Sequence, residues 1–246
     1  MDTSWCSAEA MPSLQQVLTD TLAVIAPVEC VGCGEPDTSL CVPCSQPFCS
    51  NGIEVQRAIS RELFGRTVRA CANYQGSSRA VVVGFKDQGH YRIAPFLAQS
   101  LARLLEPLVE AHPHALIVPV PSTIRGRLRR GIEPTSVLLR ELGRLRTTWN
   151  CSQALKIPGY ASSWMAQPSK TLSRRERLAS PRRFRVNRTV ANREVILLDD
   201  VVTTGSTLEA CARAIRENGG VVVAAVALAA TPRDSMVAHQ QSVNRT

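Results

Sequence analysis

The stretch that decides the fold is Val195-Ile196-Leu197-Leu198-Asp199-Asp200-Val201-Val202-Thr203-Thr204-Gly205-Ser206-Thr207-Leu208. It opens with an apolar run, typical of a buried central strand, that ends at two adjacent carboxylates. A short turn rich in hydroxyl groups follows. From Ser206 to Ile215 apolar residues recur at helical spacing, and Gly219 and Gly220 stand where a helix would end. The stretch therefore predicts a strand, a tight loop and a helix.

A strand, loop and helix in this order form an anion site, because backbone N–H groups and the positive end of the helix dipole point to one place. Gly205 would let the backbone approach a ligand closely. Four hydroxyl side chains can add donors: Thr203, Thr204, Ser206 and Thr207. Asp199 and Asp200 can accept hydrogen bonds from sugar hydroxyls. A phosphate beside a diol describes a ribose 5-phosphate; the alternative is an ordinary buried strand leading to a surface turn.

The same stretch closely resembles the phosphoribosyl diphosphate (PRPP) motif of type I phosphoribosyltransferases. That motif is a short apolar strand, two acidic residues, two apolar residues, then Thr-Thr-Gly and a further Thr, and this sequence meets every position. The resemblance implies that Asp199 and Asp200 hold the ribose hydroxyls and are the candidate catalytic residues. It also implies that residues 203–207 bind the 5-phosphate.

A second anion site is predicted where the apolar run from Ala115 to Val120 breaks at Pro121 and a run of arginines follows. Arginine side chains suit diphosphate oxygens, because the guanidinium group offers paired donors. In the resembling family this position is the diphosphate loop. The resemblance carries that role to Val120, Pro121, Ser122 and Arg125.

Four cysteines form two Cys-x-x-Cys pairs near the N-terminus: Cys30, Cys33, Cys41 and Cys44. Four thiolates at this spacing suit a tetrahedral, structural Zn²⁺, and the metal would supply folding energy to a segment too short to have its own core. Disulfides are the alternative, although they are rare in cytosolic proteins. Cys49 is a further candidate for the fourth ligand.

The remaining pattern alternates strands with helices, which predicts a parallel α/β sheet. Helices are expected over 14–25, 78–86, 95–108 and 134–145, and strands over 69–74, near 155, over 184–186 and over 221–229. Ligands of such sheets bind at the carboxyl ends of the strands, so both anion sites would face one ligand. Lys86 and His90, near a helix end, are interpreted as surface residues.

Charge is unevenly distributed along the chain. From Arg125 to Arg193 there are 17 Lys and Arg against 3 Asp and Glu, a local charge of +14; since the chain carries +9, the remainder carries −5. This segment suits diphosphate or nucleic acid, or it is an Arg-rich solvated surface. Its stretch from Gln167 to Arg177 predicts a mobile lid, with Gln167, Ser173, Arg174 and Arg177 as the candidate residues.

The order of these parts resembles the ComF family of competence-associated, phosphoribosyltransferase-like proteins. The resemblance implies a type I phosphoribosyltransferase fold with an N-terminal zinc knuckle, PRPP with Mg²⁺, and a link to uptake of single-stranded DNA. The expected parts are a tail and helix over 1–28, the knuckle over 29–50, the main domain over 60–232 and a tail over 233–246. The sequence departs from the family at Ile132-Glu133-Pro134 and at Ser180-Pro181, around the acceptor side and the lid.

Three functions fit these features. The first is an enzyme that transfers ribose 5-phosphate from PRPP to an unknown acceptor and releases diphosphate. The second is a single-stranded-DNA-binding accessory protein, with aromatic residues among the basic ones at Trp149, Tyr160, Trp164 and Phe184. The third is a PRPP-sensing regulator without turnover. No apolar run is long enough to span a bilayer, and a cytoplasmic location without membrane insertion is expected.

Overall fold

The computed structural model describes residues 28–55, 68–122, 131–157, 184–186 and 190–232. Five predicted features lie outside these residues: the helix over 14–25, Arg125 of the diphosphate loop, the aromatic residues Tyr160 and Trp164, the lid, and the tail over 233–246. Their predicted roles stay predictions.

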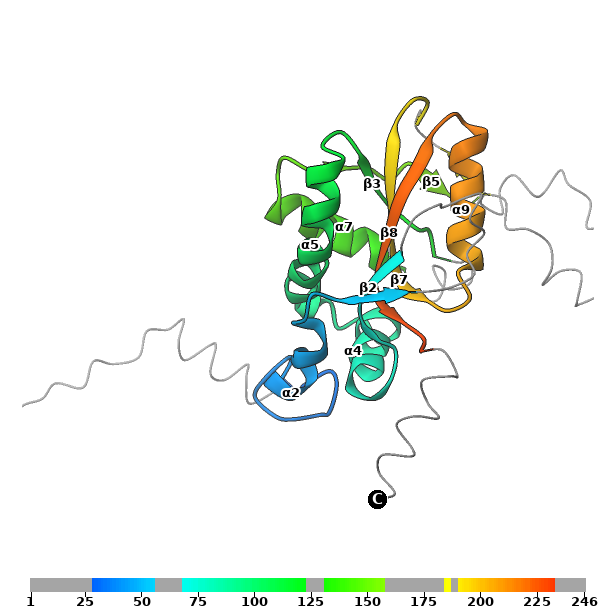
Figure 1. Ribbon diagram of the computed structural model, residues 1–246. Helices are drawn as coiled ribbons and strands as arrows, with labels where there is room; N and C mark the ends of the chain where they lie inside the picture. Colours follow the sequence, from blue (N-terminus) through cyan, green and yellow to red (C-terminus); the bar gives the residue numbers. More distant parts are fainter. Residues whose placement is uncertain (1–27, 56–67, 123–130, 158–183, 187–189, 233–246) are drawn as a thin grey trace, which may run out of the picture.

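A sheet flanked by helices forms the centre of the molecule (Figure 1). It has six strands in the order β1-β2-β8-β7-β3-β4. Its strands are β1 (Ile53–Val55), β2 (Val68–Asn73), β3 (Leu116–Pro119), β4 (Asn150–Cys151), β7 (Glu194–Val202) and β8 (Val221–Ala230). Every neighbouring pair is parallel except β1 with β2. The predicted parallel α/β sheet is thus confirmed, and an antiparallel strand is added at one edge.

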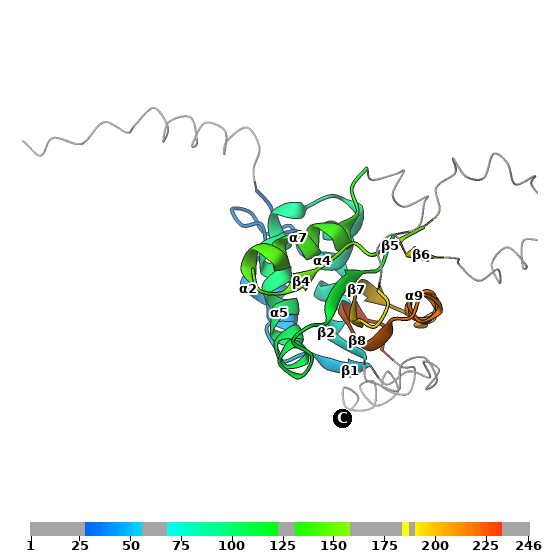
Figure 2. The ribbon, with the colours of Figure 1, turned by 90° about the horizontal axis from the view of Figure 1, so that it is seen from above.

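Helices cover both faces of this sheet. They are α4 (Gly76–Asp87), α5 (Ala94–Ala111), α7 (Pro134–Leu145) and α9 (Ser206–Glu217), with the short α2 (Val42–Ser45), η1 (Gln46–Phe48) and η2 (Tyr91–Ile93). Helices α5 and α7 pack against each other on one face, and α9 lies on the opposite face (Figures 1 and 2). The connections β3–α7–β4 and β7–α9–β8 run in opposite directions along the sheet, which agrees with α7 and α9 lying on opposite faces.

The strand β7 contributes to both hydrophobic cores. Ile196 and Leu198 belong to the core on the α5 and α7 side, whereas Val195 and Leu197 belong to the core beneath α9. Successive side chains of a strand point to opposite faces, so a strand covered on both sides needs an unbroken apolar run. This explains why the sequence around β7 shows no polar alternation.

The structure differs from the predicted elements in three places. First, β7 continues past both aspartates to Val202, because Val202 still pairs with Ala230 of β8. Second, the strands near 155 and 185 are β5 (Leu155–Lys156) and β6 (Arg185–Val186), which form a separate antiparallel pair. Third, β1 and β4 were not predicted, since two or three residues carry too little periodicity to detect.

Candidate functional site

A pocket of about 340 Å³ opens at the carboxyl ends of β3 and β7. The chain leaves β3 for β4 on one side and leaves β7 for β8 on the other, so the pocket lies at the switch point where α/β sheets bind ligands. Three groups of residues line it: Tyr74, Lys86 and Asp87; Val120, Pro121 and Ser122; and Asp199, Asp200, Val201, Thr203 and Thr207. The structure thus brings the two predicted anion sites to one cavity.

The loop after β7 has the geometry expected of a phosphate loop. Gly205 has φ +80° and caps the N-terminus of α9, a left-handed conformation that glycine adopts without steric cost. The Thr204 Oγ1 accepts a hydrogen bond from the Ser206 N–H at 3.4 Å and donates to the Ser206 Oγ at 3.0 Å. Because Thr203, Thr204 and Ser206 are exposed, their hydroxyls remain accessible to an anion at the positive end of α9.

Asp199 and Asp200 are buried at the base of the pocket, 8% and 5% exposed. Among the described residues they are the only charged side chains that are buried. Asp199 Oδ1 accepts the Asp200 N–H at 2.8 Å, and Asp200 Oδ1 accepts the Val201 N–H at 2.7 Å. Burial first, and the neighbouring Asp200 carboxylate second, raise the pKa of Asp199 to about 8. The two adjacent carboxyl groups are therefore placed in different electrostatic environments.

Lys86 forms an ion pair with Asp200, so the interpretation of Lys86 as a surface residue was wrong. The Lys86 Nζ donates to Asp200 Oδ1 at 2.8 Å from the last turn of α4, with 30% of the lysine side chain exposed. Burial acts to lower the pKa of Lys86, but the carboxylates of Asp200 and Asp199 outweigh it and raise that pKa. No motif marks this lysine; its only signal is a cation near the C-terminal end of a predicted helix. His90, by contrast, is exposed as expected.

The end of β3 forms the opposite wall of the pocket through Val120, Pro121 and Ser122. Two hydrogen bonds fix this wall: the Val120 N–H donates to the Leu198 carbonyl at 2.8 Å, and the Thr135 Oγ1 donates to the Val120 carbonyl at 3.0 Å. The predicted diphosphate loop therefore begins at a defined place beside β7.

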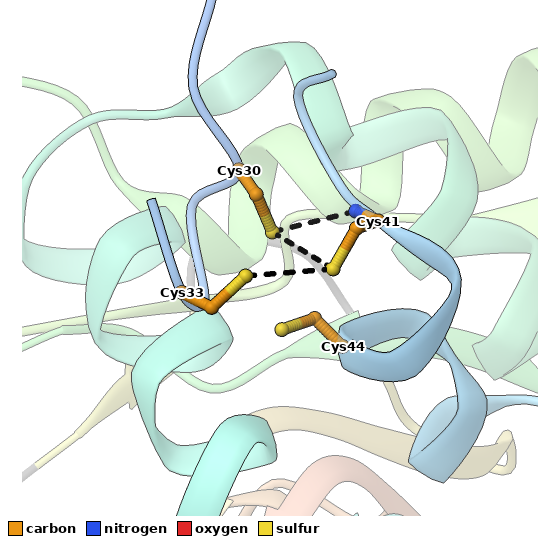
Figure 3. Close-up of side chains that lie close together, drawn as sticks. All are labelled: Cys30, Cys33, Cys41 and Cys44. Atoms are coloured by element: carbon orange, nitrogen blue, oxygen red, sulfur yellow. Dashed lines mark hydrogen bonds between the residues drawn. The ribbon is translucent and has the colours of Figure 1, made fainter. Parts of the chain in front are cut away.

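The four predicted cysteines come together beside α4, where Val31 lies against Gly84, and their sulfur atoms lie within 4.8 Å of one another (Figure 3). The Sγ of Cys41 lies 3.5 Å from the Sγ of both Cys30 and Cys33. Sulfurs bound tetrahedrally to zinc at about 2.3 Å would be separated by about 3.8 Å, so this cluster has the size of a zinc site. The thiols are free, which argues against the disulfide alternative.

Backbone donors favour the thiolate form of one of the four cysteines, Cys30, whereas the pKa values of Cys33 and Cys44 are raised. The Cys30 Sγ accepts N–H groups from Gly32 at 3.4 Å and from Cys41 at 3.3 Å. Burial acts to raise the pKa of Cys30, but the N–H groups of Cys41, Gly32 and Cys33 together lower it to about 6. Such donors stabilise the thiolate, which is the form that binds metal. Cys49 is exposed and is not part of the cluster.

Comparison with known proteins agrees with this architecture. The family model described as "Phosphoribosyl transferase domain" matches residues 119–242, just over half of the chain. The chain is 26% identical over 200 residues to the DNA utilization protein YhgH of Escherichia coli O157:H7, covering 79% of this chain and 85% of that protein. It is 27% identical over 194 residues to the YhgH proteins of Escherichia coli K12 and Shigella flexneri, covering 76% of this chain and 82% of each.

The parallel sheet and the pocket at its switch point define an open α/β protein with its candidate site at the carboxyl ends of the strands. Within that class, the chain belongs to the phosphoribosyl transferase domain family. The resemblance to the ComF family is confirmed by that domain, by the similarity to YhgH and by the N-terminal cysteine cluster. No helix within the described ranges has the length and apolar character needed to cross a membrane.

Proposed function

We propose that the protein binds PRPP with Mg²⁺ and transfers its ribose 5-phosphate to an acceptor, with release of diphosphate, as a ComF-type protein of DNA uptake and use. The observation that carries this proposal is the single pocket shared by the loop after β7, the buried aspartates and the end of β3. The family match supports the transfer of ribose 5-phosphate. The name of the YhgH relatives, DNA utilization protein, supports the role with DNA.

Each wall of the pocket has a role in this proposal. The hydroxyl-rich loop over 203–207 and the N-terminus of α9 bind the 5-phosphate. Asp199 and Asp200 bind the ribose diol. Val120, Pro121, Ser122 and Arg125 bind the diphosphate, and Gln167, Ser173, Arg174 and Arg177 close over it. Carboxylate and diphosphate oxygens are the hard ligands that Mg²⁺ prefers, and the ion would offset the charge of the departing diphosphate.

Two adjacent carboxyl groups with different partners can serve one diol. Asp200, which is paired with the Lys86 ammonium group, accepts a hydrogen bond from one hydroxyl. The raised pKa of Asp199 leaves its carboxyl group largely protonated below about pH 8, so that it can donate as well as accept. The pair thus matches a diol, which offers both donors and acceptors.

In the transfer step, the bond between C1 of the ribose and the diphosphate oxygen breaks, and the diphosphate leaves with the electron pair. The acceptor nucleophile then donates a pair to C1. Positive charge develops on the sugar ring in between. Catalysis would come mainly from holding both phosphate ends and the acceptor in line.

Calorimetric titration with PRPP and Mg²⁺ tests this function. We expect wild type to bind and the Asp199→Asn/Asp200→Asn variant to lose at least tenfold in affinity, because both diol partners are altered. Glu217→Gln is the matched control, since it removes an exposed carboxylate at the far end of α9. Equal affinity of the double variant and wild type would overturn the proposal.

Single-stranded DNA is the second candidate partner. The +14 segment from Arg125 to Arg193 and the name of the YhgH relatives favour it. Contacts to phosphates release counterions, so affinity for an oligonucleotide should fall steeply between about 50 and 200 mM salt. Fluorescence anisotropy of a labelled single strand measures this slope; affinity that is weak and independent of salt would exclude the second candidate.

The four-cysteine cluster is proposed to hold one structural Zn²⁺, with Cys30, Cys33, Cys41 and Cys44 as ligands. Four protein ligands leave no open coordination position for a reaction. The ion would stabilise the segment around α2, which packs against α4.

The domain limits are also proposed, with residues 29–50 as the zinc knuckle and residues 60–232 as the transferase domain.

A further inference from the structure

Glu133, one of the residues at which the sequence departs from the ComF pattern, lies at the wall proposed for the diphosphate. Its Oε1 accepts the Ser122 N–H at 2.6 Å, and its Oε2 accepts the Ser136 hydroxyl at 3.2 Å. Ser122 lines the pocket. A carboxylate of the chain itself therefore occupies a backbone donor at the start of the proposed diphosphate loop.

The two strand–loop–helix units of the pocket differ at this point. Glycine, without a side chain, caps α9 at Gly205, whereas Glu133 occupies the capping position of α7. The backbone of Glu133 is extended, with φ −101° and ψ 109°, and its side chain reaches back to the end of β3. The β7 unit is therefore open to a bound anion, whereas the β3 unit already contains the carboxylate of Glu133.

We propose that Glu133 is an internal competitor of the diphosphate group, and that it sets the affinity of the pocket for ligands that carry diphosphate. This inference rests on the proposed function. The single N–H of Ser122 cannot serve both anions fully. A diphosphate oxygen near this N–H would also lie a few ångströms from the Glu133 carboxylate, where like charges repel even in a solvated pocket. Diphosphate binding therefore requires the carboxylate to leave Ser122.

The inference makes Glu133 a specificity-determining residue. PRPP and inorganic diphosphate must displace its carboxylate, but ribose 5-phosphate, which ends at the ribose, need not. Removal of the negative charge should therefore tighten binding of the first two ligands alone. A merely structural capping role for Glu133 would not separate the ligands in this way.

The experiment is calorimetric titration of the full chain with PRPP, diphosphate and ribose 5-phosphate, each with Mg²⁺. Glu133→Gln keeps the size and an acceptor for Ser122 but removes the charge. It should bind PRPP and diphosphate about fivefold to tenfold more tightly than wild type, with ribose 5-phosphate unchanged. Glu141→Gln, two turns further along α7, is the matched control and should leave all three affinities unchanged.

Ser136→Ala provides a second variant that disturbs folding less. It removes only the hydroxyl that holds Oε2, so it should give a smaller gain for the same two ligands. Unchanged or weaker diphosphate binding by Glu133→Gln would overturn the inference, and so would an equal gain for ribose 5-phosphate. If wild type and variants bind neither PRPP nor ribose 5-phosphate, the proposed function itself fails, and this inference fails with it.

Discussion

The Lys86 Nζ lies 2.8 Å from the Asp200 Oδ1, although 114 residues separate the two in the sequence. The pair joins the last turn of α4 to the carboxyl end of β7 at the floor of the pocket. A buried carboxylate without such a partner would be protonated or would destabilise the fold. Lys86 therefore offsets the cost of burying the Asp200 side chain where a ribose would bind.

Replacing Lys86 tests this relationship. We expect Lys86→Met to weaken PRPP binding and to lower the free energy of unfolding by about 1–3 kcal/mol, a value reduced because the pair is partly exposed. Lys86→Arg should recover most of the PRPP affinity and most of the free energy of unfolding, since it restores the cation. Lys156→Met, at an exposed lysine of β5, serves as the control. Urea unfolding and calorimetry measure the two effects; a Met variant equal to the control would contradict the role of Lys86.

The pH dependence of stability reports on Asp199, whose pKa lies at about 8 in the folded chain against an ordinary value of 3.8. The folded state then holds this proton more tightly than the unfolded state, so the contribution is complete below about pH 4 and is lost as pH rises to 8. Asp199→Asn lacks this titration. The variant should gain stability relative to wild type between pH 5 and 8, on the order of a few kcal/mol.

Urea unfolding of wild type and Asp199→Asn at four pH values isolates this difference, because the other titrating groups are common to both proteins. Curves that stay parallel from pH 5 to 8 would show that Asp199 is ionised throughout. In that case the assignment of a donor role to its carboxyl group would be wrong.

Two helical glycines should respond oppositely to alanine. A Cβ at Gly84 of α4 would meet the Val31 Cγ2 at 2.1 Å, where the cysteine segment packs on the helix. Gly84→Ala should therefore cost about 1–3 kcal/mol of stability through overpacking. A Cβ at Gly143 of α7 meets only the Cys151 side chain, with the Sγ at 3.9 Å, so Gly143→Ala should gain up to about 1 kcal/mol. Thermal unfolding compares them; equal shifts would refute the close contact.

Metal content distinguishes the four clustered cysteines from Cys49. We expect about one Zn²⁺ per chain in wild type and in Cys49→Ser, and a large loss of zinc in Cys33→Ser. Of these two exposed cysteines, Cys33 has its sulfur in the cluster and Cys49 does not. Elemental analysis gives the stoichiometry, and Co²⁺ substitution gives an absorption spectrum sensitive to tetrahedral thiolates. Loss of metal from Cys49→Ser would assign Cys49 as a ligand.

Much of the pocket could be predicted because its parts are continuous in the sequence. The strand, paired acids and hydroxyl loop around Asp199 form one local pattern, and the break at Pro121 forms another. Their meeting in one pocket followed from the parallel order of the strands, since carboxyl ends share one edge. The zinc-sized cluster followed from cysteine spacing alone.

The missed features depend on contacts between distant segments. Lys86 looks like any lysine near a helix end until α4 is placed against β7. The extension of β7 beyond Asp200 depends on pairing with Ala230, and the two residues of β4 form a strand only because β3 lies beside them. Glu133 was visible as a departure from the family pattern, but only the structure shows that its carboxylate contacts Ser122.

The order of the strands also has a consequence for biosynthesis. β8 follows every other described strand in the sequence, yet it lies between β2 and β7 and joins the two halves of the sheet. As the chain emerges from the ribosome, the N-terminal half with its cysteines and the half that carries β3 and β7 cannot pair until Val221–Ala230 is available. The floor of the pocket, which needs Lys86 from one half and Asp200 from the other, is therefore completed only when this strand has been made.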